Sequence, residues 1–290
     1  MALIAVAADK GAPGVTTACV ALAAVWPRPV LLAECDPAGG DIACRLPAAT
    51  GGQLDPGRGL LSLAVAARRG IGAGQVLEHT QKLSGGIDVL AGVVTAEQGA
   101  GLELLWGPLG VALAQLPGVD VIADCGRLGA DGPPYDLLAS ASSVVLVTRG
   151  TLAEVVRLRE RVPAVTAALA SRYRQGTPVG VVVVAGQRRF RASLAEVAHA
   201  LGGVAGSGLA ERGAVGSGQA ERGVAGSGPA EREGAGVVGG LAYDPQSAEA
   251  LRGEWGGRLN RSLLMRTARD LARRLAAPLA ASAAASAGRG

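Results

Sequence analysis

A stretch of eight residues near the start of the chain has the residue types of a loop that binds phosphate. It reads Lys10-Gly11-Ala12-Pro13-Gly14-Val15-Thr16-Thr17. The apolar run 3–8 leads into it, and a segment of helical character, 16–25, leads away from it. In a strand, loop and helix of this kind, backbone N–H groups and the positive end of the helix face one anion. The order of these elements therefore predicts a phosphate site at the loop.

The loop departs from the usual pattern, G-x-x-x-x-G-K-[ST], at two positions that matter for chemistry. Gly14 and Thr16 match the second glycine and the hydroxyl residue. Val15, however, stands where the lysine belongs, and Asp9 stands where the first glycine belongs. Losing a charge-assisted contact costs about 1.5–3 kcal/mol, which is roughly ten- to a hundredfold in affinity. Asp9 would also bring a negative charge toward a phosphate, so the sequence predicts weakened binding.

Acidic residues follow two further predicted strands. Glu34-Cys35-Asp36-Pro37 comes after the run 29–33, and Asp124-Cys125-Gly126-Arg127 comes after the run 119–123. Carboxylates beside a phosphate-binding loop can hold Mg²⁺ and a water molecule next to the phosphate. The loop and the two acidic segments, each at the end of a strand, therefore predict one composite site.

Each of these features also has a purely structural explanation. The loop could be only a tight turn, and Asp36 and Asp124 could each cap the segment that follows. Arg127 and Arg149 lie at the ends of two predicted strands. They could contact phosphate in place of the missing lysine, or they could be solvated surface side chains. The sequence leaves these alternatives open.

The elements that must position these residues alternate along the chain. Of the 290 residues, 49% are apolar and 2% are aromatic, so Ala, Val and Leu must build the core. Near-continuous apolar strands that alternate with helices predict an α/β fold with a doubly wound, mostly parallel sheet covered by helices on both faces. Ligands of such sheets bind beyond the carboxyl ends of the strands. The predicted strands are 3–8, 29–33, 86–90, 119–123, 143–148, 179–185 and 237–242. The predicted helices are 16–25, 59–69, 101–116, 152–170, 193–201 and 258–277.

In its motifs the chain resembles the MinD/ParA family of deviant-Walker ATPases, whose loop reads K-G-G-x-G-K-T-T. The resemblance spans the chain apart from a repeat at 203–236 and the tail. It implies a P-loop NTPase fold, ATP and Mg²⁺ as cofactors, and a homodimer. Lys10 matches the family's signature lysine, which reaches across the dimer to the partner's nucleotide.

The resemblance also implies roles for single residues. Thr16 matches the hydroxyl that binds magnesium, Asp36 the water-positioning acid of the D-x-D-P motif, and Asp124 the Walker B aspartate, so all three are expected around Mg²⁺. The segment Tyr243-Asp244-Pro245 looks like the family's loop near the base. The remaining nucleotide contacts would come from Gly11, Ala12, Pro13, Gly14, Val15, Thr16 and Thr17. Glu34 replaces the first acid of D-x-D-P, and Ala12 replaces a glycine.

The function implied is nucleotide binding in spatial positioning or regulation, of the partition, septum-site or pilus-assembly type. Because Val15 adds nothing to transition-state charge stabilisation, the loop argues against efficient hydrolysis. Two alternatives remain. One is an active ATPase in which Lys10 or an arginine compensates for Val15. The other is a nucleotide-independent scaffold that keeps only the fold. The sequence does not identify a protein partner.

The last predicted helix has an arginine face and an apolar face. Such a helix could lie on an anionic membrane or bind a nucleic-acid backbone. It lacks bulky aromatic side chains, which favours a helix that closes the fold with its apolar face on the sheet. The cations are Arg258, Arg261, Arg266, Arg269, Arg273 and Arg274, and the opposite face has Leu259, Leu263, Leu264, Thr267, Ala268, Leu271 and Leu275.

Domain organisation and location follow from composition. Residues 1–202 and 237–279 are expected to form one α/β domain, interrupted at 203–236 by a flexible ten-residue repeat of Gly, Ser, Ala, Glu and Arg, and followed by a disordered tail at 280–290. The four cysteines form no C-x-x-C pair, which argues against zinc. No signal peptide or membrane span is evident, so a cytoplasmic location is expected.

Overall fold

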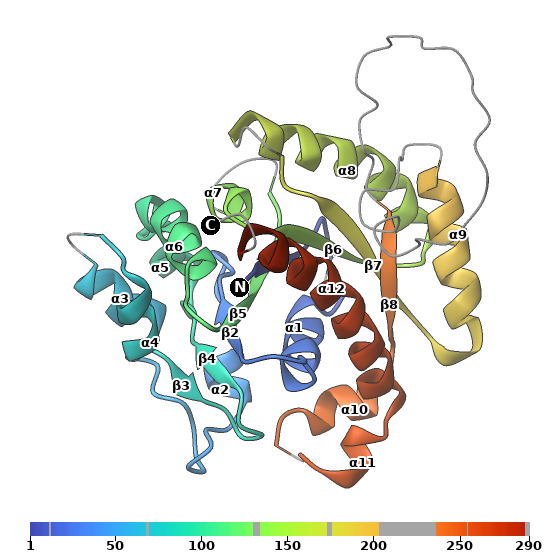
Figure 1. Ribbon diagram of the computed structural model, residues 1–290. Helices are drawn as coiled ribbons and strands as arrows, with labels where there is room; N and C mark the ends of the chain where they lie inside the picture. The colour runs from blue at the N-terminus through green and yellow to red at the C-terminus, as the bar shows by residue number, and fades with distance from the viewer. Residues whose placement is uncertain are drawn as a thin grey trace.

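The computed structural model describes residues 1–11, 13–67, 70–129, 134–172, 176–202, 236–253 and 255–287. Within them, eight strands form one sheet in the order β3-β4-β2-β5-β1-β6-β7-β8 (Figure 1). Neighbouring strands are parallel except β3 and β4, which are antiparallel. The strands are β1 (Leu3–Ala8), β2 (Val30–Glu34), β3 (Gln81–Lys82), β4 (Asp88–Leu90), β5 (Asp120–Arg127), β6 (Ser143–Arg149), β7 (Val179–Ala185) and β8 (Val237–Ala242). The predicted α/β class, with a mostly parallel sheet, is confirmed.

Helices cover both faces of the sheet and enclose two hydrophobic clusters. One cluster lies under α1, α2, α11 and α12, and the other under α3, α4 and α6 to α9. The helices are α1 (Val15–Ala24), α2 (Ile42–Arg45), α3 (Leu60–Ala66), α4 (Ala73–Glu78), α5 (Ala96–Ala100), α6 (Trp106–Ala114), α7 (Pro134–Ala139), α8 (Leu152–Arg172), α9 (Phe190–Gly202), α10 (Pro245–Ala250), α11 (Gly257–Asn260) and α12 (Leu263–Ala287). Two short 3-10 helices are η1 (Glu103–Leu105) and η2 (Gln187–Arg189).

The strands at the centre of the sheet are buried on both faces. Every residue of β1 is buried, and so are the first six residues of β5 and of β6. This explains their near-continuous apolar sequences, because a parallel strand between two helical layers has no solvent face. The carboxyl ends of β1, β2 and β5 therefore meet at one edge, where the loops of interest begin.

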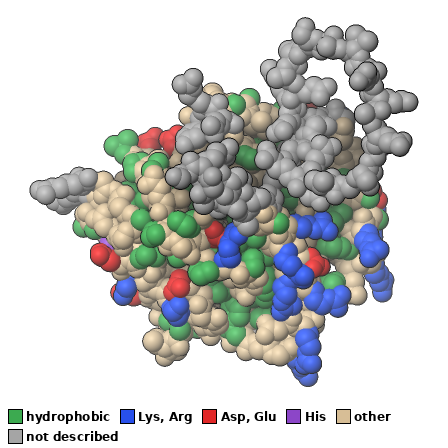
Figure 2. Space-filling view, in the orientation of Figure 1, with side chains coloured by type: hydrophobic (Ala, Val, Ile, Leu, Met, Phe, Trp, Pro, Cys, Tyr) green, Lys and Arg blue, Asp and Glu red, His purple; other side chains and the backbone are tan. Residues whose placement is uncertain are grey.

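Helix α12 closes the fold, as its apolar face predicts. Leu264, Met265 and Leu271 of this helix are buried in the cluster that it shares with α1. The hydroxyl of Thr267 accepts a hydrogen bond from the Ala242 N–H at 3.0 Å, which ties the helix to the end of β8. Figure 2 shows basic side chains gathered over the surface where Figure 1 draws this helix. Among the residues that the structure describes, no helix combines the length and apolar character needed to cross a membrane.

The structure corrects several predicted boundaries. Helix α12 continues to Ala287, so the stretch 280–287 is helical where disorder was expected; alanine, its main residue, has the highest helix propensity. The predicted helix 101–116 is divided into η1 and α6. Strand β5 runs through Arg127, so Asp124 lies within the strand and not after it. Residues 203–235, which hold most of the predicted repeat, and Ala12 lie outside the described residues.

Candidate functional site

The loop between β1 and α1 turns with the backbone geometry that its glycines allow. Gly11 has φ +84° and Gly14 has φ +96°, values that side chains other than glycine rarely adopt. Gly14 is the N-cap of α1, and its carbonyl accepts a hydrogen bond from the Ala18 N–H at 2.9 Å. The amino end of α1 therefore opens toward the edge of the sheet where β2 and β5 end, which is the arrangement needed to hold an anion.

Val15 belongs to the hydrophobic core. Its exposed fraction is 8%, and it is part of the cluster that contains Ile4 and Val6 of β1. The position that carries lysine in the usual loop pattern is thus occupied by a packing residue. The loop contributes no cation at this point to a ligand.

Asp9 is engaged by helix α8. One carboxylate oxygen lies 3.0 Å from Arg161 Nε, and the other lies 4.0 Å from Arg157 Nε. Arg161 also donates hydrogen bonds to the Gly129 carbonyl and to the Tyr135 hydroxyl. The Asp9 carboxylate therefore faces α8, where the positive charge of Arg161 above all offsets the negative charge that was expected to disfavour a phosphate.

Asp124 and Thr16 lie together beneath the loop. Asp124 is almost fully buried, and its carboxylate accepts hydrogen bonds from the Thr16 side chain and from the Gly126 N–H at 3.1 Å. Burial raises the pKa of Asp124 to about 6, against the lowering effect of these two hydrogen bonds, and the nearby charges of Asp36 and Asp41 raise it further. A cation beside this carboxylate would relieve that cost.

Asp36 is positioned by the backbone of β5. Between Val6 and Ala8 the pairing of β1 with β5 shifts register, and Gly126 within this irregular stretch has φ +58°. A Cβ on Gly126 would lie 1.9 Å from an Asp36 carboxylate oxygen, so the close approach requires glycine. Asp36 accepts a hydrogen bond from the Ala38 N–H at 2.8 Å. Partial burial raises its pKa, while that hydrogen bond and the Arg127 charge lower it.

Glu34 has a structural position that its place in the D-x-D-P motif did not predict. Its buried carboxylate accepts hydrogen bonds from the Ile42 and Gly92 N–H groups, both at 2.9 Å. A Cβ on Gly40 would lie 1.9 Å from its oxygen. Burial raises the pKa of Glu34 to about 7, partly offset by the two N–H groups. This side chain connects the loop after β2 to the loop after β4. In the sequence, only glycines such as Gly40 and Gly92, which leave room for the Glu34 side chain, could have indicated this position.

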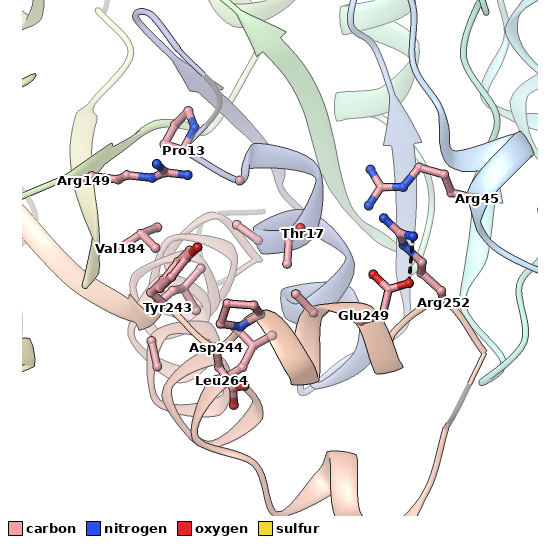
Figure 3. Close-up of a pocket in the computed structure, with 16 residues that line it drawn as sticks. Pro13, Thr17, Arg45, Arg149, Val184, Tyr243, Asp244, Glu249, Arg252 and Leu264 are labelled. Atoms are coloured by element: carbon pink, nitrogen blue, oxygen red, sulfur yellow. Dashed lines mark hydrogen bonds and ion pairs between the residues drawn. The ribbon is translucent and has the colours of Figure 1, made fainter. Parts of the chain in front are cut away.

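A cavity of about 500 Å³ opens beside the amino end of α1 (Figure 3). Its size lies in the range of small-molecule sites. Pro13, Gly14 and Thr17 line one side. Tyr243-Asp244-Pro245 lines another, and the Arg149 guanidinium lies 5.7 Å from the centre of the Tyr243 ring. Asp244 caps α10, since its carboxylate accepts hydrogen bonds from the Ser247 N–H at 3.1 Å and hydroxyl at 2.7 Å.

The remaining predicted residues are divided between two places. Lys10 is exposed and lines, with Asp9 and Arg157, a smaller depression that adjoins the cavity at Pro13. Thr16 does not line the cavity itself but lines a small neighbouring depression together with Thr17. Two cavity residues, Arg45 and Arg252, were not among the candidates.

The side chains beneath the loop suit Mg²⁺ better than they suit a metal ion whose ligands all come from the protein. In the described part of the chain, no group of three His, Cys, Asp or Glu side chains could hold a metal ion. Mg²⁺, however, usually keeps several waters and takes only one or two protein ligands besides substrate phosphates. The hydroxyl of Thr16 beside the Asp124 carboxylate fits that requirement.

Comparison with known proteins gives similarity only at the level of structure. No protein-family model and no curated protein sequence matches the chain. A ParA family ATPase from Chlorobium tepidum TLS has a TM-score of 0.63 at 15% identity, over 93% of this chain and 98% of that one. The septum site-determining protein MinD from Pyrococcus horikoshii OT3, complexed with Mg-ADP, has a TM-score of 0.54 at 14% identity, over 94% and 95%. Cobyrinic acid a,c-diamide synthase from Mycobacterium smegmatis, with bound ATP analog and magnesium, has a TM-score of 0.51 at 22% identity, over 69% of this chain and 82% of that one.

These similarities establish the fold. The chain has the P-loop NTPase fold of the ParA and MinD ATPases, as its motifs predicted. Identities this low do not carry an activity from one protein to another. The cobyrinic acid a,c-diamide synthase is an example, because its structure is similar to this chain while its name describes a function different from that of the ParA and MinD ATPases.

Proposed function

We propose that this chain is a MinD/ParA-like protein that binds a magnesium nucleotide and acts in spatial positioning or regulation. The observation that carries the proposal is the contact of Thr16 with Asp124 beneath the amino end of α1, next to a cavity of about 500 Å³. A helix terminus for the phosphates, a hydroxyl and a carboxylate for Mg²⁺, and a cavity for the rest of the ligand are then adjacent.

In the proposed complex the nucleotide spans the loop and the cavity. Its phosphates lie at the backbone N–H groups of the loop and at Thr17, and its base lies toward Tyr243-Asp244-Pro245. Asp36, whose carboxylate lies against β5 near Asp124, positions the attacking water. Lys10, exposed at the edge of the site, is available to the nucleotide of a second copy in a homodimer.

Binding is expected to be weak and hydrolysis slow. Val15 is buried in the core, so the loop offers no lysine to the phosphates. Backbone N–H groups remain, and they supply part of the binding energy of such loops. Phosphoryl transfer depends mostly on electrostatic stabilisation of the transition state, which an apolar Val15 does not provide.

Equilibrium binding of ATP with and without Mg²⁺ tests the proposal. Wild type is expected to bind ATP in the micromolar to millimolar range, more tightly with Mg²⁺. Thr16→Ala and Asp124→Asn should remove the magnesium effect, while Thr166→Ala, on helix α8 at the opposite face of the sheet from α1, should leave it intact. Absence of binding at millimolar ATP would defeat the proposal and favour a nucleotide-independent scaffold. Release of phosphate at several turnovers per minute would favour the active ATPase.

A further inference from the structure

Two arginines converge on the cavity from different elements. Arg45 is the last residue of α2, and Arg252 follows α10. Both line the cavity and also the small depression that Thr16 and Thr17 line. Figure 3 shows their guanidinium groups directed toward one another near Thr17. The two positive charges repel each other, and this repulsion is offset in part by the carboxylates of Asp41 and Glu249, which pair with Arg45 and Arg252.

Each arginine is oriented by a carboxylate of its own segment. Arg45 Nη1 donates to Asp41 at 2.7 Å, and Arg252 Nη1 donates to Glu249 at 2.8 Å. The Arg45 and Arg252 side chains are 36% and 44% exposed, and ion pairs this exposed contribute little. A guanidinium has five N–H donors in a planar fork. The carboxylate therefore orients each guanidinium, and the N–H groups that do not contact it can donate to a ligand.

The other cations of the site are placed differently. Val15 leaves the loop without its lysine, and Lys10 lies at the depression on the side of α8. Arg149 lines the cavity but lies over the Tyr243 ring, on the side expected for the base. Among the cavity-lining residues, Arg45 and Arg252 are therefore the cations that share a surface with Thr16 and Thr17.

We infer that Arg45 and Arg252 together bind a phosphate group of a nucleoside di- or triphosphate and take the place of the missing loop lysine. The inference rests on the nucleotide site proposed above. Guanidinium forks suit phosphate because two N–H groups donate to two phosphate oxygens at once. The ligand would accept hydrogen bonds from the donors that Asp41 and Glu249 leave free, and its negative charge would reduce the repulsion between the two arginines.

The test compares binding of ATP with binding of adenosine. Arg45→Gln and Arg252→Gln should each weaken ATP binding about tenfold, the loss of roughly one charged contact. Adenosine, which has no phosphate, should bind within twofold of wild type. Arg273→Gln is a matched control, because Arg273 pairs with Asp270 at 3.1 Å with the same i,i+3 spacing as Arg252 and Glu249. This control should leave both affinities unchanged.

The outcomes separate this inference from the proposed function. If wild type binds ATP and the double variant Arg45→Gln with Arg252→Gln binds it within twofold, the arginine pair does not hold phosphate. The same conclusion follows if adenosine binding falls as much as ATP binding. Wild type that binds no ATP at all overturns the nucleotide site, and this inference with it.

Discussion

The backbone of Gly126 lies against the carboxylate of Asp36. A Cβ on Gly126 would lie 1.9 Å from Asp36 Oδ2, and the φ of +58° at Gly126 is one that other residues rarely adopt. Gly126 also donates its N–H to Asp124 at 3.1 Å. One glycine therefore sets the positions of both acidic side chains of the candidate site.

Substitution of this glycine should displace Asp36. Gly126→Ala is expected to cost about 2–3 kcal/mol of folding free energy, because it combines backbone strain with a steric clash. It should also weaken binding of magnesium nucleotide. Urea denaturation measures the first effect. Gly118→Ala is the matched control: φ is +75° there, but nothing lies within 4 Å of the added Cβ, so only about 1 kcal/mol is expected. Equal costs for the two variants would contradict the close approach.

Replacing Val15 with the lysine of the usual loop pattern should destabilise the protein and should not restore tight ATP binding. In Val15→Lys the ammonium would enter a core position that is 8% exposed, and burying that charge or bending the loop to avoid it costs about 1–3 kcal/mol. Thermal unfolding and ATP binding measure the result. Val15→Met keeps the position apolar and should lose less stability. A lysine variant as stable as wild type, with ATP binding tenfold tighter, would show that position 15 faces the ligand.

Glu34 should make folding stability depend on pH. Its folded-state pKa of about 7 lies above the unfolded value near 4.5, so the folded state holds the proton more tightly. Its contribution to stability is therefore full below about pH 4.5 and falls as pH rises toward 7. Glu34→Gln should be less stable than wild type at pH 5, because its amide cannot accept from both the Ile42 and Gly92 N–H groups.

The deficit of that variant should shrink by about 1–3 kcal/mol between pH 5 and pH 8, since only wild type must ionise a buried carboxyl. Denaturation at a series of pH values measures it. Glu97→Gln, at a fully exposed residue, controls for loss of one acidic group. A deficit that stays constant or grows with pH would contradict the raised pKa of Glu34.

The ion pair of Asp9 with Arg161 should be energetically coupled. A double-mutant cycle on Asp9→Asn and Arg161→Gln should give a coupling free energy of about 0.5–3 kcal/mol, because the two groups are largely buried and 3.0 Å apart. The cycle with Arg157→Gln is the comparison. Arg157 lies 4.0 Å from Asp9 and is 44% exposed, so its coupling should stay below about 0.5 kcal/mol. Similar coupling free energies in the two cycles would contradict a stronger interaction of Asp9 with Arg161 than with Arg157.

The fold was predictable because its strands carry a strong signal. Runs such as Leu3–Ala8 and Val179–Ala185 are long, apolar and buried on both faces. Strand β3 was missed because it has two residues and neither is buried. Alternation of strands and helices then indicated a parallel sheet, whose carboxyl edge gathers the loop, Asp36 and Asp124.

The finer geometry of the site was not predictable, because it depends on tertiary contacts. No spacing in the sequence links Arg45 to Arg252, which lie on separate short segments and meet only at the cavity. The same holds for Asp9, whose charge is directed by arginines more than 140 positions away on α8. Val15 could be recognised as a missing lysine, but its inward packing became visible only with the core around it.

A crystal structure of the protein with ADP and Mg²⁺ would show whether and where the nucleotide binds. We expect phosphate density at the amino end of α1, Mg²⁺ beside Thr16 and Asp124, and the base in the cavity next to Tyr243. Saturating nucleotide that leaves this cavity empty, or that binds elsewhere on the molecule, would contradict the proposed nucleotide site.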